Sequence, residues 1–97
     1  MTVEQQVAEF TKALEDAKAI DVRAYDVRGK SGFTDFFIVA TGAAAPHLKA
    51  LVKAMPKAYR ISGDPESGWI VSDYIDVVVH IFSAEARAYY ALEKLWE

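Results

Sequence analysis

The sequence contains no cysteine and no long apolar run, and both absences remove whole classes of function. Without cysteine there is no disulfide framework, no thiolate metal site and no thiol nucleophile, so any catalysis must rest on carboxylates, hydroxyls or the two histidines. No apolar stretch reaches the roughly 18 residues that span a membrane. The opening Met-Thr-Val-Glu lacks the basic start and apolar stretch of a signal peptide. We therefore expect a cytoplasmic protein.

Strong charge of either sign is also lacking. Eleven basic residues against fourteen acidic ones give a net charge of −3. Because phosphate backbones bind clustered lysine and arginine, this balance predicts little direct contact with nucleic acid and favours a basic protein as partner. The length of 97 residues, 53% of them hydrophobic, fits a single domain over residues 1–97.

The first half of the chain predicts a helix and two strands. Apolar residues recur at helical spacing, and Thr2 with Gln5 forms a capping box, so a helix is expected over residues 3–18. Residues 20–27 alternate as in a strand, and the continuous apolar run over 36–41 is typical of a buried central strand.

The second half predicts a second helix, three strands and a closing helix. Pro46 suits a first helical turn and Pro56 ends that helix. A short strand is expected over residues 58–61, a turn at Gly63-Asp64-Pro65, and two longer strands after it. Ser83 caps a helix that reaches about Trp96. The order predicts an α/β fold with a mixed sheet of about five strands and about three helices.

The stretch SGWIVSDYIDVVVHIF, residues 67–82, holds several residue types that bind metals. With Tyr74 and Ile75 as a two-residue turn, Asp73 lies opposite Asp76, and His80 lies about 13 Å along its strand from Asp76 at about 3.3 Å per residue. That distance is too long for one metal ion to bind both. We therefore expect no metal site, no cofactor and no catalytic residues here.

The same pairing divides the hairpin into two faces. Trp69 lies opposite His80 on one face, and the two rings are expected to pack together. The other face is apolar and should form the core: Ile70, Val77, Val79 and Ile81. A tryptophan left exposed on a sheet face indicates a protein interface, unless helices cover it. The second histidine, His47, is expected at the surface near a helix start.

A Gly-Lys-Ser sequence within RGKSGFTDFF, residues 28–37, suggests a phosphate-binding loop. The phosphate-loop motif requires a glycine where Ala24 stands, so its spacing excludes that motif. The order of strand, turn and buried strand is loosely that of nucleotidyltransferases, which hold metal ions with two acids on alternate residues. Here Phe37 follows Asp35 at the second position, so one acid is missing. A polar turn is the simpler interpretation, and weak anion binding by Lys30 and Ser31 is the alternative.

Three segments together resemble the ribosomal silencing factors, also called Iojap proteins. They are DVRGKSGFTDFFIVATG, GWIVSDYIDVVVHIF and EARAYYALEKLW, in this order, and the likeness runs from about Ile20 to Trp96. The resemblance implies a nucleotidyltransferase-like α/β domain without the catalytic acids. It also implies a translation repressor, not an enzyme, that binds the large ribosomal subunit through large-subunit ribosomal protein fourteen and blocks joining of the small subunit.

The resemblance also assigns contact residues. The family's tryptophan-containing hairpin implies partner binding by Trp69, Ile70, Val71, Asp73, Tyr74 and His80. Lys30 and Tyr90 are additional contacts on this interpretation. In the closing helix, Leu92 and Leu95 share a helical stripe and are expected in the core.

The chain departs from the family pattern at three places. Ala43, Ala44 and Ala45 stand where members carry hydroxyl residues, followed by Pro46 where they carry arginine. Ile75 stands where members carry glycine, which puts the turn type and the register in question because a β-branched residue resists positive φ. The chain is also shorter between Leu48 and Gly63 by roughly two helical turns.

Two alternatives from other functional classes remain. One is a residual nucleotide-binding enzyme that uses Lys30, Ser31 and Asp35. The other is a homodimerisation module that uses the same sheet face, since an apolar surface can bind a second copy as well as a ribosome.

Overall fold

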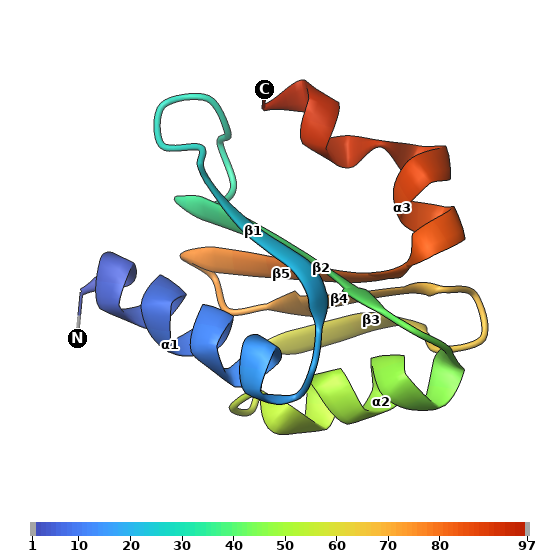
Figure 1. Ribbon diagram of the computed structural model, residues 1–97. Helices are drawn as coiled ribbons and strands as arrows, with labels where there is room; N and C mark the ends of the chain where they lie inside the picture. Colours follow the sequence, from blue (N-terminus) through green and yellow to red (C-terminus); the bar gives the residue numbers. More distant parts are fainter. Residues whose placement is uncertain (1, 97) are drawn as a thin grey trace.

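The computed structural model describes residues 2–96 as one five-stranded mixed sheet with helices on both faces (Figure 1). The strands lie in the order β1-β2-β5-β4-β3, and only the β2–β5 pair is parallel. Their bounds are β1 Ile20–Asp26, β2 Phe36–Gly42, β3 Arg60–Asp64, β4 Trp69–Asp73 and β5 Val77–Ser83. The predicted α/β fold with a mixed five-stranded sheet is confirmed.

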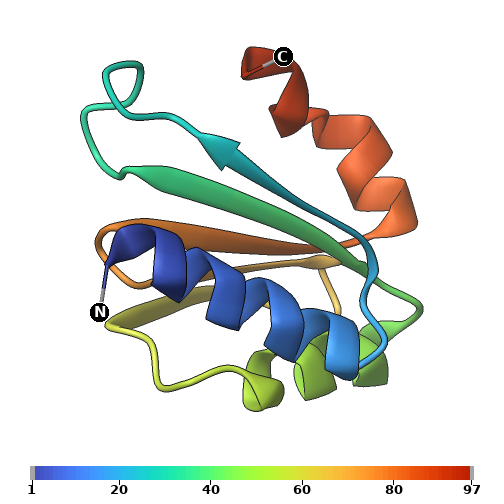
Figure 2. The ribbon, with the colours of Figure 1, turned by 60° about the vertical axis from the view of Figure 1, so that its left-hand side comes forward.

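Helices α1 (Val3–Asp16) and α2 (Ala45–Ala54) cover one face of the sheet. Helix α3 (Ala84–Tyr90) and the 3₁₀ helix η1 (Leu92–Leu95) lie on the other face, toward its β1–β2 side (Figure 2). Every residue of β2 is buried because helices lie on both sides of it. The predicted Thr2–Gln5 capping box is present, and Ser83 Oγ accepts from Ala86 N–H as the cap of α3.

The core is divided into two layers by the sheet. The layer under α1 and α2 is the larger and contains Phe10, Leu14, Phe36, Ile38, Ala40, Leu48, Leu51, Met55, Ile70, Val77, Val79 and Ile81. The layer under α3 and η1 contains Val27, Phe37, Val39 and Phe82. Ile70 and alternate residues of β5 thus form the core face that the sequence predicted.

The predicted register of the β4–β5 hairpin is wrong by two residues. Trp69 lies opposite Phe82, Val71 opposite His80, and Asp73 opposite Val78, so Asp73 does not face Asp76. The loop has three residues, Tyr74, Ile75 and Asp76, closed by a 2.8 Å hydrogen bond from Tyr74 N–H to the Val77 carbonyl. A slip of two residues leaves every side chain on its predicted face.

Ile75 occupies the left-handed region at φ +72°, which costs an L-residue about 1 to 2 kcal/mol. The Asp73 carboxylate compensates in part by accepting from Ile75 N–H at 2.7 Å. We expect Ile75→Gly to raise the free energy of unfolding by about 1 kcal/mol in urea denaturation, after allowing for the greater unfolded-state freedom of glycine. Ile75→Ala keeps the Cβ and is the matched control. A gain no larger for glycine than for alanine would show that the turn is unstrained.

The closing helix is shorter than predicted. Helix α3 ends at Tyr90, and Ala91 takes the left-handed conformation at φ +48° before η1 begins. The expected helical stripe is therefore broken. Leu92 still packs on the core, whereas Leu95 is 71% exposed, so the core placement of Leu95 is wrong.

Arg87, in α3, binds both Glu93, in η1, and residues of the sheet. Its guanidinium donates to both Glu93 carboxylate oxygens at 2.7 and 2.9 Å, to the Asp21 carbonyl at 2.7 Å and to Thr41 Oγ1 at 2.9 Å. Both side chains of the Arg87–Glu93 pair are nearly buried. The hydrogen bonds from Arg87 lower the pKa of Glu93. This bonding explains why the chain turns at a non-glycine residue.

We expect Arg87→Met to lower the free energy of unfolding by about 2 kcal/mol, because it leaves the Glu93 carboxylate without its cation. Chemical denaturation of the variant measures the loss. Adding Glu93→Gln should recover about 1 kcal/mol through the shared interaction. Equal stabilities of the single and double variants would contradict this role for the pair.

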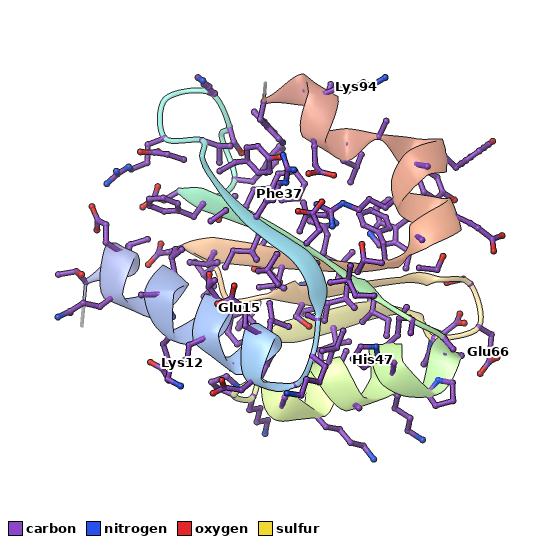
Figure 3. All side chains as sticks on the ribbon, in the orientation of Figure 1. Lys12, Glu15, Phe37, His47, Glu66 and Lys94 are labelled. Atoms are coloured by element: carbon purple, nitrogen blue, oxygen red, sulfur yellow. The ribbon has the colours of Figure 1, made fainter. Side chains whose placement is uncertain are left out.

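Two smaller expectations also need correction. The third strand starts at Arg60 and includes Gly63 and Asp64, so the turn falls at residues 65–68. His47 is half-buried, not at the surface, and joins α2 to the end of α1 (Figure 3). Ala43 N–H donates to His47 Nδ1 at 2.9 Å. Nε2 of His47 therefore carries the proton and donates to the Ala17 carbonyl at 2.9 Å.

Candidate functional site

The half of the sheet that α3 and η1 leave uncovered carries a continuous row of side chains beside Trp69. Strand pairing places Val71 opposite both Ser62 and His80, and Asp73 opposite Arg60. Paired residues point to the same side of a sheet. We call this surface the Trp69 face and define it by Arg60, Ser62, Trp69, Val71, Asp73 and His80.

Trp69 is half-buried at the border between this face and α3. Its ring stacks on Phe82 at a centroid distance of 5.2 Å and lies 4.5 Å from the ring of Tyr90. The helix therefore covers one side of the indole and leaves the rest open. A rigid, partly exposed indole is a typical anchor for a protein partner because it offers a large area at little cost in conformational entropy.

His80 fixes the orientation of this indole. Trp69 Nε1–H donates to His80 Nδ1 at 3.0 Å, and the Phe37 ring lies edge-on to the imidazole at 4.5 Å. Since Nδ1 accepts, the imidazole is neutral. Burial lowers the pKa of His80 to about 4. The expected packing of His80 beside Trp69 is confirmed, although the two residues are diagonal neighbours and not opposite one another.

The structure separates the other predicted contacts from this face. Ile70 is buried under α2 on the opposite side of the sheet. Tyr74 also points to that side, where its ring lies 4.4 Å from Phe10 and its hydroxyl donates to the Pro56 carbonyl at 2.6 Å. Lys30 lies in the loop between β1 and β2, and β5 separates these two strands from β4 in the strand order of the sheet. Tyr90 is 46% exposed and borders the face through its contact with Trp69.

Sequence patterns did not single out three exposed aromatic residues, Phe33, Tyr59 and Tyr89. Tyr89 is exposed next to Tyr90, with the two rings perpendicular at 5.0 Å. Phe33, in the β1–β2 loop, is 93% exposed. Tyr89 was missed because the sequence gives no signal for which side of a short helix faces solvent. Phe33 follows a glycine in a polar loop, and this position is the one signal that could have indicated its exposure.

Comparison with known proteins assigns the chain to a family. A family model described as "Ribosomal silencing factor during starvation" matches residues 1–97. The chain belongs to this family. A ribosomal silencing factor from Halalkalibacterium halodurans is 36% identical over 92 residues, covering 87% of this chain and 79% of the relative. A chloroplastic Iojap protein from Zea mays is 36% identical over 94 residues, covering 90% of this chain and 41% of that protein.

A solved structure agrees with the family's fold. A crystal structure of a protein from Chromobacterium violaceum matches with a TM-score of 0.88 and 30% identity, over 99% of this chain and 87% of that one. The ribosomal silencing factor family is one of regulatory proteins associated with the ribosome and not of enzymes. The resemblance seen in the three sequence segments is therefore confirmed at the level of family.

In this silencing factor the Gly-Lys-Ser segment is a closed turn. The Val27 carbonyl accepts from both Lys30 N–H and Ser31 N–H at 3.0 Å, so these amides do not form a free anion nest. Ser31 Oγ accepts from Phe33 N–H at 3.1 Å. Over residues 2–96, no group of three or more histidine or acidic side chains could hold a metal ion. The geometry gives the nucleotide-binding alternative no support.

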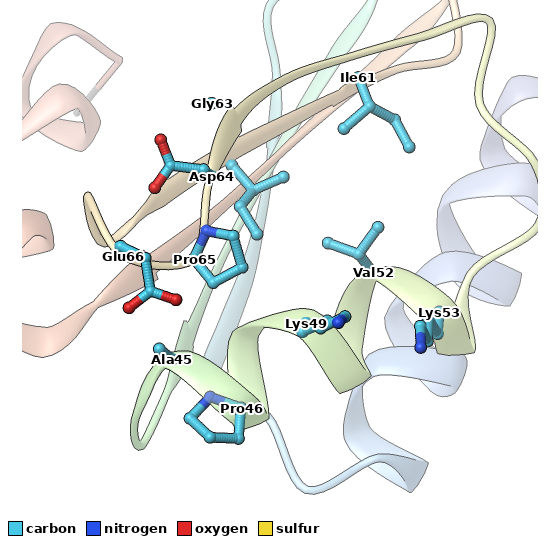
Figure 4. Close-up of a pocket in the computed structure, with 11 residues that line it drawn as sticks. Ala45, Pro46, Lys49, Val52, Lys53, Ile61, Gly63, Asp64, Pro65 and Glu66 are labelled. Carbon is cyan, nitrogen blue, oxygen red and sulfur yellow. The ribbon is translucent and has the colours of Figure 1, made fainter.

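A groove of about 720 Å³ lies between α2 and β3, on the opposite side of β3 from the Trp69 face (Figure 4). Val52, Ile61 and Ile70 contribute apolar side chains, and Lys49 and Lys53 stand along α2. Among the helices of the described residues, none is long and apolar enough to cross a membrane.

Proposed function

We propose that this ribosomal silencing factor represses translation by binding large-subunit ribosomal protein fourteen through its Trp69 face, and that the bound protein blocks joining of the small subunit in the cytoplasm. The observation that carries the proposal is the partly exposed indole of Trp69, held by His80 and Phe82 at the border of an uncovered sheet half. Interfaces are enriched in such aromatic anchors.

The apolar centre of the face and the net charge of the chain support a protein partner of basic character. Val71 gives the face an apolar centre beside the indole, and Asp73 and Arg60 place one charge of each sign at its edge. The chain as a whole carries a net charge of −3, which favours encounter with a basic ribosomal protein. Self-association through the same face would compete with this docking.

Co-sedimentation tests the proposal. The protein is mixed with purified large subunits or with small subunits and centrifuged through sucrose. We expect it to migrate with the large subunit alone, and to be released when isolated ribosomal protein fourteen is added in excess. A protein that stays at the top of the gradient with large subunits, or migrates equally with both, would overturn the proposal.

A further inference from the structure

The net charge of −3 conceals a strongly basic segment. Residues 36–63 contain no aspartate or glutamate, yet they carry Lys49, Lys53, Lys57 and Arg60. The segment therefore has a charge of +4, and the rest of the chain has a charge of −7. The clustering matters because binding to phosphate depends on local cations and not on the net charge of the chain.

The fold gathers these cations along one edge of the molecule. Lys49 and Lys53 are four residues apart on α2, so they lie on the same side of the helix, and both line the groove together with Ile61 (Figure 4). Lys57 lies in the short connection from α2 to β3, and Arg60 is the first residue of β3. Because β3 is the edge strand, nothing from the sheet lies beyond it.

An exposed aromatic ring is interleaved with the cations. Tyr59 is 70% exposed, and the Arg60 guanidinium lies 5.9 Å from its ring centroid. Flat side chains of this kind provide stacking surfaces for unpaired bases, and cations beside them bind the sugar-phosphate chain.

These cations also lack acidic partners within residues 2–96. Elsewhere Arg28 pairs with Asp26 and Glu4, and Arg87 pairs with Asp21 and Glu93. Lys49, Lys53, Lys57 and Arg60 form no ion pair in the part of the chain that the structure describes. Their charge is therefore available to a ligand.

We infer that this edge, which we call the basic edge (Lys49, Lys53, Lys57, Tyr59 and Arg60), contacts the RNA backbone of the large subunit when the Trp69 face is docked. The inference rests on the proposed function. Arg60 belongs to both surfaces, because it lies opposite Asp73 in the β3–β4 pair and follows Tyr59 at the start of the edge strand. It revises the expectation, drawn from net charge, of little contact with nucleic acid.

The acidic residues of the groove indicate which part of the basic edge contacts the RNA. Asp64 and Glu66 lie near Ala45 and Pro46, at the beginning of α2, whereas Lys53 lies near its end (Figure 4). Phosphates are repelled by the first end and attracted by the second. The RNA contact is therefore centred on the last turns of α2 and the start of β3.

The salt dependence of binding to large subunits tests the inference. Removing one cation that binds a phosphate lowers the magnitude of the slope of log K against log salt concentration by about 0.7 to 0.9. We expect Lys49→Gln/Lys53→Gln/Lys57→Gln to lower that slope by about 2. The matched control, Lys12→Gln/Lys18→Gln/Lys94→Gln, changes the net charge equally on α1, just beyond it and on η1, and should leave the slope within about 0.5 of the wild type (Figure 3).

Ultraviolet cross-linking of the complex identifies the ligand. We expect the peptide containing Tyr59 to carry a nucleotide of the ribosomal RNA. Attachment of Tyr59 to a ribosomal protein instead, or an unchanged salt slope in the triple variant while Trp69→Ala still weakens binding, overturns the RNA contact and leaves the proposed function standing. A wild-type protein that never binds the subunit overturns both.

Discussion

Replacing Trp69 with alanine should weaken binding to the large ribosomal subunit by about 2 to 4 kcal/mol, which is roughly a 30- to 1,000-fold increase in Kd. The indole is the largest side chain of the Trp69 face, and its stacking on Phe82 and Tyr90 holds it in one orientation before the partner arrives. The substitution therefore removes both the area that the partner would cover and the preorganisation. Fluorescence anisotropy of labelled protein titrated with subunits gives both Kd values.

Two further variants test whether the interface lies on the Trp69 face. Phe33→Ala removes an aromatic side chain that is more exposed than Trp69 and lies in the β1–β2 loop, and we expect a change below about 0.5 kcal/mol. Ser62→Lys places a cation on the exposed edge strand, opposite Val71, where a basic partner would be repelled without disturbing the core. Strong loss with Phe33→Ala and none with Trp69→Ala or Ser62→Lys would move the interface to the β1–β2 loop.

Acid should destabilise the protein through His80 by about 3 kcal/mol. Burial lowers the folded-state pKa of His80 to about 4 from an ordinary value of 6.5. Between these values the unfolded chain binds a proton that the folded protein does not, so the free energy of unfolding falls as the pH falls from about 6.5 to about 4. A difference of about 2.5 pKa values corresponds to about 3 kcal/mol. Urea denaturation from pH 7 to pH 4 measures the fall.

His80→Gln is the matched control for this titration. Its amide oxygen can accept from Trp69 Nε1–H, as Nδ1 does, but it does not bind a proton in this range. We expect the pH dependence of the wild type to exceed that of the variant by about 3 kcal/mol, whatever the carboxylates contribute to both. Parallel curves for the two proteins would show that His80 is accessible to water and charged in the folded state.

Much of the fold could be predicted from the sequence because each element has a local cause. The apolar run of β2 requires burial on both faces, the Thr2–Gln5 box begins α1, and Ser83 begins α3. The two faces of the hairpin follow from the alternation of its strands, and that alternation is preserved under a register error of two residues.

The errors arose where tertiary contacts override local preference. Ile75 adopts positive φ because Asp73 and the anchored Tyr74 hold the loop, so a two-residue turn was the wrong choice. Ala91 ends α3 because Arg87 draws Glu93 back to the sheet. The local spacing of residues does not show that Asp73 and Tyr74 hold the loop at Ile75, nor that Arg87 binds Glu93.

The candidate site was predictable only in part for the same reason. Trp69, Val71, Asp73 and His80 alternate along their strands and were correctly placed together on one side. Ile70 and Tyr74 were assigned to the partner-binding site because they belong to the hairpin segment that resembles the family. Such a segment does not distinguish the two faces of a strand. The basic edge was missed because net charge averages over the chain, whereas the fold brings residues 49–60 to one edge.

Subunit joining measures the central claim most directly. Large subunits are incubated with the protein, small subunits are added, and the fraction of joined ribosomes is read from sucrose-gradient profiles. The wild type should reduce joining in proportion to the fraction of large subunits it occupies, and Trp69→Ala should restore joining at the same concentration. Full joining on large subunits that still carry the wild-type protein would contradict the account.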